Sequence, residues 1–154
     1  VCRHDVTSAR QMLDKALELW PWADYGIFTA AVADFYPEPF GKAKFKKNAA
    51  ESGFDSRFLP NPDILSTLAA EAQPRQRILG FAAESDNLVE HAKAKLLRKK
   101  AHMIAGNLIS APNSGFASSS NQVFVCDVAG REEHWPTLSK ADVAWRLLDW
   151  LLTL

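Results

Sequence analysis

The stretch that decides the fold is RILGFAAESDNLVEHAKAKLLRKKAHMIAG, residues 77–106. Its apolar start, 77–83, is typical of a strand buried inside a sheet. A helix follows from Asn87, where Glu90 is placed to close a capping box, and it ends near the apolar run 101–106, which predicts another strand. A strand, a helix and a strand within about 30 residues form the unit from which parallel sheets are built.

The same alternation continues on both sides of this unit. Apolar spacing predicts the other elements at these residues: a helix at 7–20, strands at 25–32 and 121–128, a helix from 61 to about 72, and a helix at 139–151. We expect Thr7 or Ser8 to cap the first helix, Asn61 to cap the second, and the strand 25–32 to be buried on both faces. Alternating strands and helices predict an α/β fold with a doubly wound, mostly parallel, Rossmann-like sheet, in a single domain over 1–154.

One segment departs from this alternation. Residues 42–47 place lysines and apolar side chains on opposite sides of an extended chain, and with 55–59 they predict a small strand-hairpin excursion near 42–59. The lysines at 42, 44, 46 and 47 repel one another unless an anion lies near them, although lysines also protect a solvated sheet edge from association. The residues alone leave both interpretations open.

Composition limits the classes of function. The chain has 154 residues, of which 47% are hydrophobic and 23% charged, as in a soluble globular protein. Lys+Arg and Asp+Glu are each 18, so no net charge favours nucleic acid or an anionic membrane. No run is apolar for the roughly 20 residues that a membrane span needs. Two distant cysteines, Cys2 and Cys126, predict reduced thiols in a cytoplasmic protein, with Cys126 in the core.

Ligands of doubly wound sheets bind at the carboxyl ends of the strands. One predicted strand ends in Ala30-Ala31-Val32-Ala33-Asp34, where small side chains let a ligand approach the backbone and a carboxylate can bind a hydroxyl or a metal. A tightly packed strand with a helix-capping Asp shows the same pattern. In the next strand, Phe81 is either a core residue or a surface on which a base stacks.

A basic helix end follows that strand. Lys95 and Lys99 are four residues apart and share one helix face, which suits a polyphosphate. Cations at a helix C-terminus also interact favourably with the helix macrodipole, so these lysines can equally be present to stabilise the helix. The sequence has no Walker A loop, no G-x-G-x-x-G and no metal-spaced histidine pair. The residues alone therefore predict an α/β domain with cationic clusters that can meet around a phosphate-rich ligand.

Several motifs, in this order and at this spacing, carry a resemblance to a known family. They are 30–35, 44–47, 61–65, 80–84, the helix with Lys95 and Lys99, Asn107, and 113–116. The set resembles the bacterial phosphopantothenoylcysteine synthetase (phosphopantothenate–cysteine ligase) domain over nearly the whole chain. The resemblance implies a coenzyme A biosynthesis enzyme in which CTP activates the carboxylate of 4'-phosphopantothenate as an acyl-cytidylate, pyrophosphate leaves, and the amine of cysteine displaces CMP.

The resemblance also implies roles for matching residues. Lys44 matches the lysine that stabilises acyl-cytidylate formation. The residues expected to contact CTP are Phe28, Thr29, Ala30, Asp34, Pro62, Asp63, Ile64, Leu65, Phe81, Lys95 and Lys99. Mg²⁺ is expected to assist at the triphosphate, and no residue of this chain is assigned as a metal ligand.

The resemblance further implies a homodimer with contacts in 42–59. Members of the family often follow a flavin decarboxylase, so that domain is one expected neighbour in the full-length protein. They begin with a further βαβ segment that carries a Gly-rich turn and an Asn that holds the acyl-cytidylate, and the present sequence starts around the third strand of that pattern. We therefore expect ligase activity only when that segment is supplied. The alternatives are a non-catalytic nucleotide-binding or regulatory relative, and a dimeric interaction module that binds no CTP.

Overall fold

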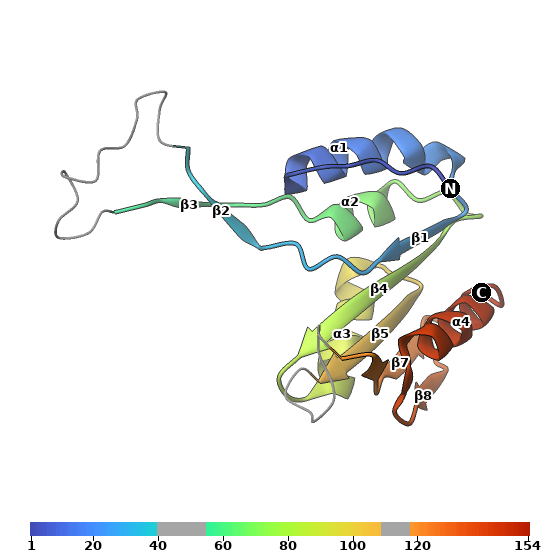
Figure 1. Ribbon diagram of the computed structural model, residues 1–154. Helices are drawn as coiled ribbons and strands as arrows, with labels where there is room; N and C mark the ends of the chain where they lie inside the picture. Colours follow the sequence, from blue (N-terminus) through green and yellow to red (C-terminus); the bar gives the residue numbers. More distant parts are fainter. Residues whose placement is uncertain (40–54, 109–117) are drawn as a thin grey trace.

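In the computed structural model, which describes residues 1–39, 55–108 and 118–154, a five-stranded sheet has the order β1-β4-β5-β7-β8 (Figure 1). The strands are Tyr25–Phe28 (β1), Arg77–Glu84 (β4), Met103–Leu108 (β5), Phe124–Asp127 (β7) and Glu132–His134 (β8). β1, β4 and β5 pair in parallel, whereas β7 is antiparallel to β5 and β8 is antiparallel to β7. Two antiparallel steps restore the direction, so β8 also runs with β1, and the expected mostly parallel α/β sheet is confirmed.

Helices cover both faces of this sheet. α1 (Ala9–Leu19), α2 (Ile64–Ala70) and α3 (Leu88–Lys99) pack on one face, and α4 (Lys140–Leu151) packs on the other (Figure 1). A short 3-10 helix, Trp20–Trp22, joins α1 to β1. The predicted strand–helix–strand unit is present as β4, α3 and β5, and the expectation of a sheet covered on both faces is confirmed.

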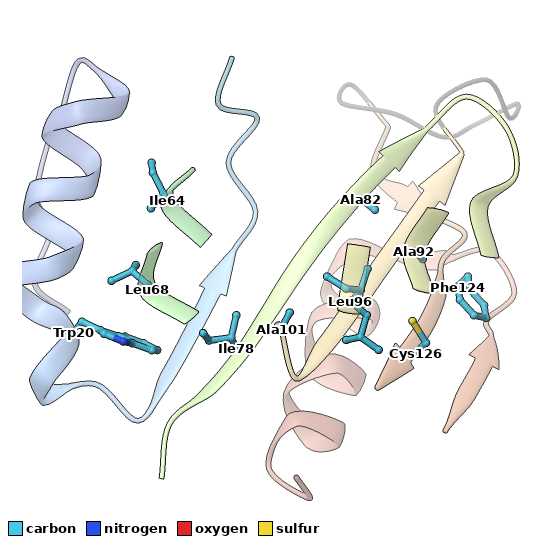
Figure 2. Close-up of a cluster of buried hydrophobic side chains, with 11 residues drawn as sticks. Trp20, Ile64, Leu68, Ile78, Ala82, Ala92, Leu96, Ala101, Phe124 and Cys126 are labelled. Carbon is cyan, nitrogen blue, oxygen red and sulfur yellow. The ribbon is translucent and has the colours of Figure 1, made fainter. Parts of the chain in front are cut away.

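Two clusters of buried apolar side chains hold these layers together. The first joins Trp20 and Leu68 to the sheet residue Ile78 on the side of α1, α2 and α3 (Figure 2). The second joins the sheet residue Leu79 to Leu147 of α4. Successive residues of a strand point to opposite faces, which is why neighbours in β4 belong to different clusters. Each fully buried side chain of this size contributes roughly 1.5–3 kcal/mol, so β4 stabilises both layers.

β1 lies at the edge of the five-stranded sheet, and this corrects the expectation that 25–32 is buried on both faces. Tyr25 and Ile27 are each 44% exposed. Their neighbour Gly26 faces inward, because a Cβ placed there would collide with the ring of Trp20. The apolar run did not reveal the edge position because that position depends on pairing, and within the described residues β1 pairs with β4 alone.

The helix caps differ in part from those expected. Ser8 caps α1 as expected. Asp63 rather than Asn61 caps α2, and its Oδ1 accepts a hydrogen bond from the Ser66 N–H at 3.1 Å. Asn87 has a left-handed backbone (φ 43°) and makes no side-chain cap, so the expected capping box is wrong. A capping side chain needs an extended backbone at its own residue, which Asn87 does not have.

Two short antiparallel sheets complete the described fold. β2 (Phe35–Pro37) pairs with β3 (Phe58–Pro60), so the expected excursion starts earlier in the chain than residue 42. β6 (Ser120–Asn121) pairs with β9 (Leu138–Ser139) beside the start of α4. Residues 42–47 and 48–53, the second of which is the expected hairpin tip, lie outside the described residues. Among the helices in the described ranges, none is long and apolar enough to cross a membrane.

Candidate functional site

A cavity of about 510 Å³ lies beside the carboxyl ends of the parallel strands β1 and β4. The segment after β1, the start of α2 and one face of α3 contribute to its wall. Every residue that the resemblance assigned to CTP lines this cavity: Phe28, Thr29, Ala30, Asp34, Pro62, Asp63, Ile64, Leu65, Phe81, Lys95 and Lys99. The fold thus brings residues from four distant segments to one site, whose volume is ordinary for a small-molecule pocket of roughly 300–1,000 Å³.

Asn61 fixes the segment that follows β1 against the start of α2. Its Nδ2 donates a hydrogen bond to the Ala33 carbonyl at 2.8 Å, and its backbone N–H donates to the Asp34 carbonyl at 2.8 Å. Asn61 also lines the cavity. The sequence placed Asn61 at a helix cap and in the 61–65 motif but did not predict this contact, because a partner 28 residues away leaves no local signal.

Lys99 and Asp63 form an ion pair that joins α3 to the start of α2. Burial opposes ionisation of Asp63, but the contact with Lys99 and the hydrogen bonds from Ser66 outweigh it and hold the pKa of Asp63 below its ordinary value. Asp63 therefore stays a carboxylate near neutral pH. Lys99 is mostly covered (19% exposed), so its charge lies in the wall of the cavity and not in open solvent.

Lys95 is a second cation in the same wall. Its Nζ donates a hydrogen bond to the Phe81 carbonyl at 2.6 Å. Burial lowers the pKa of Lys95; Glu84 opposes that change, and Lys99 and Arg98 add to it. A bound anion would offset both the lost solvation and the repulsion, so these ammonium groups are placed to attract a phosphate chain.

Two other cations of the basic helix end, Lys93 and Lys100, have structural roles. Lys93 forms an ion pair with Glu132 of β8 at 2.7 Å. Lys100 is the C-cap of α3 with a left-handed backbone (φ 52°). The sequence left two interpretations of these cations open, contact with a ligand and stabilisation of the helix end. The first therefore suits Lys95 and Lys99, and a structural role suits Lys93 and Lys100.

A second cavity, of about 570 Å³, adjoins the first on the α4 side of the sheet. Thr29, Ala30, Asp34, Phe81 and Lys95 line both cavities. The polar side chains that line only the second are Asn107, Asn121 and Lys140. Sequence reasoning did not identify the last two, which belong to no motif. Two cavities with a common wall can hold two reactants side by side.

The residues present fit a Mg²⁺ ion only together with a bound phosphate. The described residues contain no group of three or more side chains able to hold a metal. Asp34 is the carboxylate that lines both cavities. Mg²⁺ in phosphoryl-transfer sites is commonly held by one or two carboxylates and by substrate phosphates, which matches a single Asp34.

Lys44, the expected catalytic lysine, lies outside the described residues, and so does the 113–116 motif.

The fold and these cavities define the class of protein: an α/β domain with a small-molecule site at the carboxyl ends of its parallel strands and two cations in the wall of that site. The family described as DNA/pantothenate metabolism flavoprotein C-terminal domain matches residues 1–154. The chain belongs to this family. Its membership confirms the resemblance inferred from the order of the motifs.

The chain is similar to several known proteins. It is 32% identical over 154 residues to the coenzyme A biosynthesis bifunctional protein CoaBC of Vibrio vulnificus (strain YJ016), covering 100% of this chain and 38% of that protein. It is 32% identical over 150 residues to a cysteine/cysteine sulfinic acid decarboxylase of an unknown prokaryotic organism, covering 97% of this chain and 41% of that protein. The crystal structure of the C-terminal domain of CoaBC is 31% identical with a TM-score of 0.70, covering 94% of this chain and 61% of that one. The chain thus spans well under half the length of these two curated relatives.

Proposed function

We propose that this chain forms the nucleotide-binding part of a phosphopantothenate–cysteine ligase that uses CTP in coenzyme A biosynthesis. The observation that carries the proposal is that Lys95 and Lys99 line the first cavity together with the segments 28–30 and 62–65. Membership of the family over residues 1–154 and similarity to CoaBC proteins support the same reaction.

The first step of this reaction joins the acid to the nucleotide. A carboxylate oxygen of 4'-phosphopantothenate bonds to the α-phosphorus of CTP, the bond to the β-phosphate oxygen breaks, and pyrophosphate leaves. Lys95 and Lys99 would neutralise negative charge on the phosphate chain, and we assign Lys44 to stabilise charge at the reacting phosphate. Mg²⁺, held by the phosphates and Asp34, would supply further positive charge there.

The second step forms the amide. The amine of cysteine attacks the acyl carbon, a carbon–nitrogen bond forms, the bond to the CMP oxygen breaks, and the amine loses a proton. We assign the acid to the second cavity, because its common wall with the first would hold the carboxylate beside the α-phosphate. Such positioning is the main contribution of a protein to reactions of this kind.

Exchange of labelled pyrophosphate into CTP tests the proposal. The chain is mixed with CTP, Mg²⁺ and 4'-phosphopantothenate, alone and with the first segment of a related ligase domain supplied as a separate polypeptide. We expect exchange that depends on 4'-phosphopantothenate once that segment is present. CTP binding without exchange in either mixture would favour the non-catalytic nucleotide-binding relative, and absence of CTP binding would favour an interaction module.

We also propose a homodimer that forms through the β2–β3 ribbon. Phe35 and Phe58 lie on these paired strands and are 59% and 60% exposed. Large apolar side chains that gather at the surface mark contact sites. Changing both to serine should convert the dimer to a monomer in light scattering, and an unchanged mass would place the contact elsewhere.

A cytoplasmic location and a neighbouring flavin decarboxylase domain are further parts of the proposal. Cys2 and Cys126 are both free thiols, as is usual in reducing compartments. The CoaBC relative is bifunctional by name, and the chain covers 38% of its length.

A further inference from the structure

The first cavity has two chemically different ends. Lys95 and Lys99 of α3 form one end, next to Asp63 at the start of α2. Met12 and Ala16 of α1 form the other end. Met12 also lines a neighbouring cavity that neither lysine lines, whereas Lys95 also lines the second cavity, which Met12 does not, so the two groups lie at different ends of the first cavity. α2 packs against both α1 and α3 and lies between them, so α1 and α3 reach the cavity from different sides (Figure 1).

The end formed by α1 is apolar. Met12 and Ala16 are four residues apart, share one helix face, and are partly buried against the first core cluster. They are the only residues of α1 that line the cavity, and Ile64 and Leu65 extend the same apolar wall from the first turn of α2. A wall of this kind accepts the flat face of a ring, and a methionine sulfur makes favourable contacts with aromatic rings.

A nucleoside triphosphate has the same polarity, with a flat base at one end and charged phosphates at the other. On the basis of the nucleotide binding proposed above, we propose that Met12 and Ala16 form the wall that faces the base, with Met12 limiting the ring size that fits. The triphosphate then extends towards Lys95 and Lys99. This wall selects a one-ring pyrimidine over a two-ring purine by shape, because α1 offers no polar side chain to the cavity.

Replacing the side chains of this wall tests the inference. Met12→Ala removes the thioether group, and we expect the ratio of the ATP to the CTP dissociation constant to fall about tenfold, the size of effect expected for small changes in an apolar pocket. Ala16→Met fills the same end and should weaken CTP binding about tenfold. Inorganic tripolyphosphate carries no base, so it should bind the wild-type protein and both variants equally.

Leu13→Ala is the matched control. Leu13 lies beside Met12 on α1 and packs against the same core cluster, but it does not line the cavity. The control should leave the ATP-to-CTP ratio unchanged, and equal binding of tripolyphosphate shows that a variant is folded. If Met12→Ala does not fold, Ala16→Met provides the test alone.

The outcomes separate this inference from the proposed function. The inference is overturned if the ratio of the ATP to the CTP dissociation constant is unchanged in Met12→Ala, or if it changes equally in Leu13→Ala. In either case, CTP binding by the wild-type protein still supports the proposed function. Equal weakening of CTP and tripolyphosphate by Ala16→Met overturns it too, since the α1 end would then contact phosphate. A wild-type protein that binds neither CTP nor ATP overturns both.

Discussion

Replacing Lys95 and Lys99 together by alanine is expected to weaken CTP binding far more than CMP binding. The two ammonium groups lie in one wall of the first cavity, one helical turn apart on α3. A triphosphate is long enough to contact both, whereas we expect the single phosphate of CMP to contact one. The loss for CTP should therefore be about twice the loss for CMP in free energy.

The contacts that Lys95 and Lys99 already make determine how much binding free energy each lysine can contribute. Lys95 donates a hydrogen bond to the Phe81 carbonyl, and Lys99 is paired with Asp63, so each contact with phosphate replaces an existing one. Hydrogen bonds to charged groups are worth about 1.5–3 kcal/mol, and we take the lower half of that range, about 1.5–2 kcal/mol for each lysine. Two contacts then give about 3–4 kcal/mol, or roughly 150- to 900-fold for CTP, and one contact gives roughly 10- to 30-fold for CMP.

Calorimetric titration of both nucleotides into the wild-type protein and the double variant measures these losses. Lys93→Ala is the control, because Lys93 lies on the same helix, pairs with Glu132 and does not line the cavity. It should change neither affinity. Equal weakening of CTP and CMP binding in the double variant would refute the placement of the triphosphate. If Lys93→Ala weakened CTP binding as much as the double variant does, the loss would come from the overall positive charge of α3 and not from contacts of Lys95 and Lys99 with phosphate.

Three further predictions concern activity, acid stability and thiol reactivity. In a complete ligase domain, Lys44→Gln should abolish pyrophosphate exchange at an unchanged thermal midpoint, and normal exchange would remove Lys44 from the activation step. The pKa of Asp63 is held below its ordinary value of 3.8, so its carboxylate stabilises the fold above about pH 4. This contribution is lost as the pH falls through the lowered pKa. Acid titration followed by circular dichroism should therefore show a smaller loss of stability for Asp63→Asn than for the wild-type protein. Burial raises the pKa of Cys126 to about 11, so iodoacetamide at roughly pH 8 should modify exposed Cys2 first in mass spectra, and equal rates would contradict the buried position.

The sequence was sufficient for the central layers of the fold. The runs that form β4 and β5 are apolar because both faces of these strands are buried. Ile78 packs in the first core cluster and its neighbour Leu79 in the second. The spacing of α1 and its Ser8 cap are local signals as well. β1 resembled a central strand, since composition does not report how many partners a strand has. β8, with Glu132 and Glu133, has no apolar pattern and forms through pairing with β7.

The candidate site was less accessible to sequence reasoning. Spacing showed that Lys95 and Lys99 share a face but left their role open, and the assignment of the cavity residues came from the resemblance. Long-range contacts gave no local signal: Asn61 bonds to the segment after β1, and Asn121 reaches the second cavity from a short strand. Met12 looked like an ordinary core residue of an amphipathic helix, because periodicity does not distinguish a side chain facing a core from one facing a cavity.

Mapping of amide chemical shifts in the isotope-labelled chain, with CTP and Mg²⁺ added, tests most directly whether the first cavity binds the nucleotide. We expect the largest changes at Thr29, Ile64 and Phe81, which line that cavity from the segment after β1, from α2 and from β4. Arg131 and Trp150, which line a different pocket between β8 and α4, should change little. Changes centred on Arg131 and Trp150, or no changes at saturating CTP, would contradict the account.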